Sequence, residues 1–243
     1  MREFETFVFL DVQKTGSTFI TSFLKQYTHE ALLRDERHAG MPSDCDRSKF
    51  HFISVRNPFD QYASLYSFGC QSSGQLALRL NNKGLGAFYD GSWSGFESWL
   101  DFVLDPANAD LMGDGYDERS SGRAREFIGF QSYRVIKLAL PGANELLQRC
   151  DSMDAIDSLY AREKLPDHVV RTESLRADLK ELVVRKLPDR FPDLPAAIRF
   201  IDTRDPINAS QRIDRFDTIS KLSPALRRRL EEREWLLHKY FSY

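Results

Sequence analysis

The sequence predicts an α/β fold in which a parallel β-sheet is flanked by helices on both faces. Two observations lead to this prediction. Runs of apolar residues with the length of a strand, at residues 7–12 and 50–55, are each followed by apolar residues at helical spacing. The first run is almost continuously apolar, which is typical of a central parallel strand covered on both faces. Repeated strand–helix units build parallel sheets.

Each of the two joins between strand and helix has local signals of its own. In the first, Gly16 allows a turn, and the helix that follows has an apolar stripe at Phe19, Ile20, Phe23, Leu24 and Tyr27. In the second, Asn57 is a typical N-cap and Pro58 suits the first turn of a helix. The helix beyond it has its stripe at Phe59, Tyr62, Leu65 and Tyr66.

The rest of the chain is less regular. Helices are expected at 96–104, at 123–130, from Ser174 and from Ser223-Pro224, where a cap precedes a first-turn proline. Strands are expected at 135–138 and within HVVRTESL, and polar, glycine-containing loops at 81–95 and 105–122. Because there is no internal repeat and no long linker, we expect a single domain over residues 1–243.

Composition limits the function. The net charge of −2 argues against general nucleic-acid binding. There is no apolar run long enough to cross a bilayer, and the N-terminus enters a strand too soon for a signal peptide. The three cysteines are far apart and lack CxxC spacing, which argues against both a disulfide framework and a zinc site. We therefore expect a cytoplasmic protein with free thiols and no metal.

The first join has the residues of an anion site. Backbone amides at a helix N-terminus attract anions together with the helix dipole. Lys14 adds a positive charge, and three hydroxyl side chains add donors: Thr15, Ser17 and Thr18. In the simpler alternative, Gly16 only makes the turn and Ser17 only caps the helix. The nucleoside-triphosphate loop G-x-x-x-x-G-K-[ST] does not fit, because Lys14 precedes Gly16 and the earlier glycine is missing.

The second join adds another candidate anion site. Arg56 stands at the strand end, and Ser64 follows two helical turns later. An arginine can hold a phosphate through two parallel hydrogen bonds, and a serine can add a third; alternatively, Arg56 pairs with Asp60. Ligands of such sheets bind at the carboxyl ends of the strands. Two phosphate-sized sites at that edge suggest a nucleotide with phosphates at both ends of its ribose.

These two segments resemble the donor-binding motifs of the sulfotransferases. QKTGST is similar to their 5′-phosphosulfate loop, and RNPFDQYASLY is similar to their 3′-phosphate motif, in which a serine follows an arginine by eight residues. HVVRTESLRADL and the C-terminal SPALRRRLEEREWLLHKYFSY are similar to further family segments. The resemblance implies a P-loop-kinase-like fold. It also implies 3′-phosphoadenosine 5′-phosphosulfate (PAPS) as donor and adenosine 3′,5′-bisphosphate (PAP) as product.

The resemblance also implies roles for these residues. Lys14 would stabilise the negative charge that grows on the bridging oxygen, while Thr15, Gly16, Ser17 and Thr18 would hold the 5′-phosphate. Arg56 and Ser64 would hold the 3′-phosphate. An acceptor hydroxyl or amine would attack sulfur in line, a reaction that depends on positioning and charge neutralisation rather than on a metal.

A general base must take the proton of the acceptor, and His38 is the leading candidate. It lies between the two motifs, where the catalytic histidine of the family often lies, and RHAG loosely matches its setting. The alternatives are that His38 is an exposed loop residue and that Glu30 or Glu36 is the base. Asn208 and Ser210 are similar to a family segment near the nucleotide, although such residues in a polar loop usually form turns.

Two other functions fit parts of the sequence. An ATP-dependent small-molecule kinase would need an acidic magnesium ligand at a strand end, near Asp11, but the glycine–lysine order is wrong for it. The other is a non-catalytic nucleotide-binding protein on the same fold. The acceptor, a small molecule or glycan, would contact residues 69–131, which match nothing in the family. There Phe88, Tyr89 and Trp93 either stack on an acceptor ring or pack within a surface loop.

Overall fold

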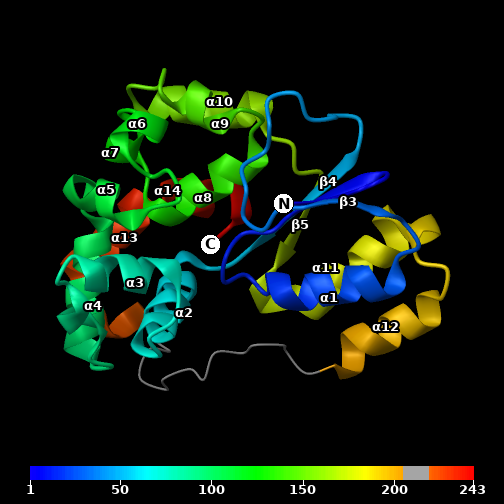
Figure 1. Cartoon of the computed structure of the whole chain (residues 1–243), viewed down its shortest axis with the longest axis horizontal. Helices are drawn as coiled ribbons and strands as arrows, with labels where there is room; N and C mark the ends of the chain where they lie inside the picture. Colours follow the sequence, from blue (N-terminus) through cyan, green and yellow to red (C-terminus); the bar gives the residue numbers. More distant parts are fainter. Residues whose placement is uncertain (205–218) are drawn as a thin grey trace. The chain divides into compact units, whose positions relative to one another are not determined.

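The computed structural model describes residues 1–204 and 219–243, and contains a five-stranded sheet and many helices (Figure 1). Its contacts divide the chain into two compact units. The first holds all five strands and is made of Met1–Arg56, Lys137–Pro141 and Lys164–Ala209. In the described residues, the second has only helices and their connections, and is made of Asn57–Ile136, Gly142–Glu163 and Ser210–Tyr243. A single domain for the whole chain stays a prediction.

The sheet is mixed, whereas the sequence predicted a parallel one. Its order is β3-β1-β2-β4-β5, with the strands at Leu32–Asp35, Arg2–Phe4, Phe7–Leu10, Phe50–Val55 and His168–Arg171. β2, β4 and β5 are parallel, as expected, but β1 runs antiparallel to both β2 and β3. The reason is that the first ten residues form a hairpin, with Glu5 and Thr6 between β1 and β2, so the chain direction reverses before the central strands.

The core of the first unit lies on one face of this sheet. Alternate strand residues Phe7, Phe9 and Phe52 are fully buried and pack with helices α1 (Ser17–Tyr27), α11 (Leu175–Glu181) and α12 (Leu194–Thr203). Figure 1 shows α1 and α11 lying along the strands. Each such side chain contributes about 1.5–3 kcal/mol when fully buried. This face therefore holds α1 against β2 and β4. Helices on the second face stay a prediction.

The second unit confirms both predicted helix caps. Asn57 accepts hydrogen bonds from the amides of Phe59 (3.0 Å) and Asp60 (3.4 Å) at the start of α2 (Pro58–Cys70). Ser223 caps α13 (Pro224–Arg233). The last predicted helix is divided into two helices. α13 ends at Arg233, and α14 (Trp235–Phe241) begins after Glu234. The other helices of this unit are α3 (Gln75–Asn82), α4 (Trp93–Leu104), α5 (Ala109–Met112), α6 (Glu118–Ser121), α7 (Ala124–Phe127), α9 (Ala143–Leu147) and α10 (Met153–Glu163).

Residues 135–138 form part of a helix, so the strand predicted there is wrong. They belong to α8 (Phe130–Ala139), whose last turn falls in the first unit. A short apolar run has no periodicity that separates a buried strand from a buried helix. The helix predicted at 123–130 breaks before Gly129, whose amide donates to the Arg233 carbonyl oxygen. The segments predicted as loops at 81–95 and 105–122 contain short helical turns. In the described ranges, no helix is both long and apolar enough to span a membrane.

Candidate anion-binding site and adjoining histidine

The parallel pairing of β2 and β4 brings the two predicted phosphate motifs to one edge of the sheet. Leu10 on β2 is paired with Ile53 on β4, so both strands end at the same edge. There the Nη1 atom of Arg56 donates to the backbone carbonyl oxygen of Lys14, at 3.4 Å. The two cationic residues, predicted separately for the two phosphates, are therefore neighbours within the first unit.

The turn between β2 and α1 presents backbone amides at this edge. Gly16 is the N-cap of α1 and has a φ of +78°, in the left-handed region that suits glycine. As a glycine it gives no side-chain hydrogen bond to the first-turn amides. These amides and the positive end of the helix dipole make the N-terminus of α1 suitable for a phosphate or sulfate oxygen.

In the protein without ligand, the surroundings of Lys14 disfavour its positive charge. Burial lowers the pKa of its ammonium group, and the positive charge of Arg56 lowers it further. Both effects disfavour the charged form. A bound anion would reverse the second effect, because it would interact favourably with both cations. The electrostatics of Lys14 and Arg56 are therefore those of a site suited to an anion.

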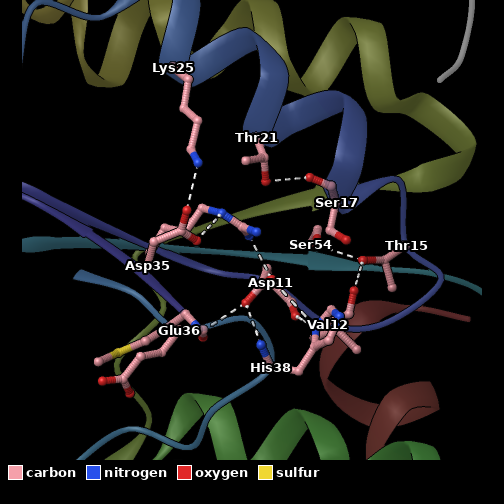
Figure 2. Close-up of polar contacts among 12 residues, drawn as sticks. Asp11, Val12, Thr15, Ser17, Thr21, Lys25, Asp35, Glu36, His38 and Ser54 are labelled. Carbon is pink, nitrogen blue, oxygen red and sulfur yellow. Dashed lines mark hydrogen bonds and ion pairs between the residues drawn. The ribbon is translucent and has the colours of Figure 1, made fainter. Parts of the chain in front are cut away.

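The Thr15 hydroxyl is used inside the fold. Its Oγ1 donates to the carbonyl oxygen of Val12 at 2.7 Å and lies 2.6 Å from Oγ of Ser54 on β4, in a fully buried position (Figure 2). Of the predicted 5′-phosphate donors, Thr15 can therefore offer its amide more readily than its hydroxyl. Ser17 is 8% exposed and Thr18 is partly exposed at the start of α1. Ser54 was not predicted as a partner of this turn, although a serine within the apolar strand FHFISV is a signal of a buried polar contact.

His38 is held against the end of β2 by Asp11. Its Nδ1 lies 2.7 Å from the Asp11 carbonyl oxygen and 3.4 Å from Asp11 Oδ2 (Figure 2). Its backbone amide donates to Asp11 Oδ1 at 3.2 Å. Its side chain is 25% exposed, so it is not a freely solvated loop residue. Asp11 precedes Lys14 by three residues, which limits their Cα atoms to a separation of at most about 11 Å. His38 is therefore tied to the edge that carries Lys14.

The two carboxylates considered as alternative bases are placed differently. Glu30 accepts a hydrogen bond from the amide of Thr6 at 2.9 Å and forms an ion pair with Arg190 at 2.9 Å. Thr6 precedes β2, so Glu30 lies at the amino end of that strand, opposite to the edge that holds Lys14. The Glu36 side chain is 55% exposed and lies 3.7 Å from Arg34. Among contacts of the described residues, those of His38 hold a candidate side chain at the edge that carries Lys14, whereas those of Glu30 and Glu36 do not.

Asp11, the residue near which a kinase would place its magnesium ligand, is engaged with cations of the protein. Its carboxylate is fully buried, with Oδ2 2.6 Å from Arg2 Nη1 and Oδ1 2.8 Å from the Met1 amino group. Within residues 1–204 and 219–243, no group of three or more His, Cys, Asp or Glu side chains is arranged to hold a metal ion. The ion pairs of Asp11 leave its oxygens poorly placed for a divalent cation.

Several predicted residues are not brought to this edge by the described contacts. Ser64 lies on α2 in the second unit and is 7% exposed, so its role beside Arg56 stays a prediction. Asn208 and Ser210 lie outside the described residues.

The aromatic residues of segment 81–95 pack within the second unit. Phe88 packs on Phe102, Trp93 on Phe96, and Tyr89 on Tyr66, with ring centroids 5.1, 5.5 and 5.6 Å apart. This favours the packed-loop alternative over stacking on an acceptor ring.

The edge of the sheet thus combines two cations, a helix N-terminus and a histidine on neighbouring parts of the first unit. Such a group of residues can hold a phosphate or sulfate ester and can accept a proton beside it. Comparisons of the chain with protein-family models, with curated proteins and with solved structures gave no match.

Proposed function

We propose that this protein is a sulfotransferase that moves a sulfuryl group from PAPS to a hydroxyl or amine of a small-molecule or glycan acceptor. The observation that carries the proposal is the contact between Arg56 and Lys14 at the carboxyl edge of β2 and β4. Two phosphate groups on one nucleotide give each cation a partner. The resemblance of QKTGST and RNPFDQYASLY to the family motifs supplies the same assignment from the sequence.

In this proposal the protein contributes positioning and charge. The α1 amides, Ser17 and Thr18 hold the 5′-phosphosulfate, and Arg56 holds the 3′-phosphate with Ser64 as a proposed additional donor. Lys14 neutralises the charge that develops on the bridging oxygen as the sulfur–oxygen bond breaks. Such donors act most strongly in a site from which water is excluded. No step needs a metal ion.

Backbone strain at two of the proposed catalytic residues supports the assignment. Lys14 and His38 have φ values of +64° and +59°, in the left-handed region that non-glycine residues rarely adopt. Such conformations cost about 1–3 kcal/mol and concentrate at functional sites. A cytoplasmic location is part of the proposal. It agrees with the three free cysteines, Cys45, Cys70 and Cys150.

The test is isothermal calorimetry with PAP, AMP and ATP, each with and without magnesium. A charge-assisted hydrogen bond contributes about 1.5–3 kcal/mol, so PAP should bind at least roughly tenfold more tightly than AMP. Binding of PAP should also be independent of magnesium. Equal affinity for ATP, or binding that requires magnesium, would contradict the proposal and support the kinase.

Turnover is then measured with ³⁵S-labelled PAPS against a panel of phenols, aliphatic alcohols, amines and free sugars. Transfer of label to any member establishes the reaction. Tight PAP binding without transfer to any of these acceptors or to water would instead favour a non-catalytic nucleotide-binding protein.

A further inference from the structure

We propose that Asp11 is the positioning residue for His38: it fixes the imidazole with the proton on Nδ1 and the lone pair on Nε2. The inference rests on the proposed function, in which His38 is the general base. Its geometric part can be measured without donor or acceptor. The sequence suggested Asp11 only as lying near the place of a magnesium ligand in a kinase, whereas its contacts connect it to a histidine 27 residues away.

The tautomer follows from the contact that Nδ1 of the imidazole makes with the backbone. Nδ1 of His38 is 2.7 Å from the Asp11 backbone carbonyl oxygen, which has no proton to give. Nδ1 must therefore be the donor, and in a neutral imidazole the lone pair then belongs to Nε2. A general base needs a lone pair that is directed away from its own support, so this tautomer suits the role.

The Asp11 carboxylate fixes the backbone of His38. Its Oδ1 accepts the His38 amide at 3.2 Å, at a residue whose φ of +59° is otherwise unfavourable. The same carboxylate is held in turn by Arg2, and Arg2 also pairs with Asp35 at 3.0 Å. Arg2 and Asp35 are cross-strand partners on β1 and β3. The histidine is thus supported by the sheet itself.

The carboxylate has a second consequence during the reaction. As the acceptor oxygen forms its bond to sulfur, its proton passes to Nε2, and the sulfur–oxygen bond to PAP breaks with its electrons leaving on PAP. His38 then carries a positive charge. Oδ2 of Asp11 lies 3.4 Å from Nδ1, close enough to stabilise that charge. Among the described residues, the charged groups paired with the Asp11 carboxylate besides His38 are the Met1 amino group and Arg2.

A purely structural explanation is that Asp11 only neutralises Arg2. The chain offers a matched control, because Asp35 pairs with the same arginine and no described contact joins it to His38. Asp35→Asn should weaken the Arg2 network yet leave the tautomer and the reaction as in the wild type. Asp11→Ala keeps the backbone carbonyl oxygen beside Nδ1 but removes the carboxylate that accepts from the His38 amide and so holds the ring against that carbonyl. Asp11→Asn keeps an oxygen at the position of the carboxylate.

The first experiment records long-range ¹H–¹⁵N correlations of the histidine rings in the wild-type protein, with His38 assigned by His38→Gln. We expect the Nδ1–H form. An Nε2–H form, or an average of both forms, would overturn the proposal whether or not any variant folds. Calorimetry with PAP on the same sample separates the tautomer of His38 from the question of whether the protein is a sulfotransferase. Failure to bind PAP contradicts the sulfotransferase, while the ring signals report the tautomer of His38 whether or not PAP binds.

The second experiment measures release of PAP from PAPS with water as the acceptor. In Asp11→Ala we expect turnover to fall about 10²-fold, as misplacement by about 1 Å can cost. The Kd for PAP should stay unchanged, and the ring signals should become an average of both forms. Asp11→Asn should recover the Nδ1–H form and part of the rate. Wild-type turnover and ring signals in Asp11→Ala would overturn the proposal.

Discussion

Nη1 of Arg56 donates a hydrogen bond to the backbone carbonyl oxygen of Lys14 across 3.4 Å, and so ties the end of β4 to the turn after β2. The contact joins two residues 42 positions apart in the chain. It places two positive charges together at the N-terminus of α1. The charge of Arg56 contributes to the lowered pKa of Lys14, so each of these residues is electrostatically coupled to the other.

Arg56→Ala should remove the preference for a 3′-phosphate. The loss of a charge-assisted contact worth about 1.5–3 kcal/mol corresponds to roughly 10- to 150-fold weaker PAP binding. Affinity for AMP, which lacks that phosphate, should change much less. Calorimetry with both nucleotides checks this. Arg34→Ala is the charge-matched control, because this exposed arginine lies in the same unit beside Glu36. An equal loss for PAP and AMP would show that Arg56 only supports the Lys14 turn.

Lys14→Ala should lower the rate of transfer more than the affinity for PAP. The charge of Lys14 matters most when negative charge develops on the leaving oxygen. That negative charge is absent from the ground state. Removal of one preorganised donor costs about 2.7–4 kcal/mol in the transition state, or roughly 10²–10³ in kcat. Single-turnover kinetics with PAPS and calorimetry with PAP measure the two quantities. A variant with near-normal turnover would reduce Lys14 to a ground-state contact.

The lowered pKa of Lys14 predicts that PAP affinity falls in alkaline solution. A bound phosphate favours the ammonium form, so binding takes up a proton once the pH approaches the pKa of free Lys14. Affinity should decrease as the pH rises through that pKa, which lies below that of an exposed lysine. Lys14→Arg stays charged and should lack this decrease. Calorimetry in buffers of different ionisation enthalpy detects the proton uptake; its absence would contradict the assignment.

The same shift affects the stability of the unliganded protein with the opposite sign. In the unfolded chain Lys14 has its ordinary, higher pKa, so between the two pKa values the unfolded state binds more protons. The contribution of this group to the free energy of unfolding therefore rises with pH in that window. Chemical denaturation of wild type beside Lys14→Arg across the alkaline range isolates it. The wild type should gain stability relative to the variant.

The hydroxyls of Thr15 and Thr18 should have separable effects. Thr15→Val leaves the Ser54 hydroxyl without its buried partner and should cost about 1–3 kcal/mol of stability, with PAP affinity retained. Thr18→Val should instead weaken PAP binding several-fold. Urea denaturation and calorimetry measure the two effects. The double variant with Ser54→Ala should cost less than the sum of the single variants, since the partners are lost together. Strongly reduced PAP affinity in Thr15→Val would contradict this prediction and show that the Thr15 hydroxyl contacts the nucleotide.

Both strand–helix joins were predictable from the sequence because their signals are local. The apolar run of β2, Gly16 at the turn, and the Asn57-Pro58 cap each determine the structure of their own neighbourhood. The antiparallel β1 was not predicted, since a short hairpin at the N-terminus looks like the beginning of one strand.

The support of His38 could not be predicted from the sequence for a different reason. It depends on the hydrogen bond from the His38 amide to Asp11, and on the ion pair of Asp11 with Arg2 on β1. These are contacts between residues far apart in sequence, and no local pattern specifies them. A polar residue directly after the apolar β2 indicated that Asp11 makes a specific contact, but nothing in the sequence indicated that His38 is its partner.

His38→Ala should lose about 10²–10⁴ in the rate of transfer if the imidazole is the general base. The structural reason is the contact with Asp11, which holds the ring at the edge that carries Lys14. A protonated imidazole cannot accept a proton, so wild-type activity should fall toward acid while PAP binding is retained. The pH dependence of kcat, measured once an acceptor is known, checks both statements.

Glu36→Gln is the matched control, because this carboxylate is two residues away and exposed. It should keep both the rate and the acidic decrease in activity, whereas His38→Ala should lose both. His38→Gln tests whether a neutral polar side chain of similar reach suffices; the expected answer is that it does not, since an amide is far too weak a base. The opposite outcome is that His38→Ala keeps both its rate and the decrease in activity toward acid, while Glu36→Gln loses them. Glu36 would then be the base, and the contact of His38 with Asp11 would serve only the fold.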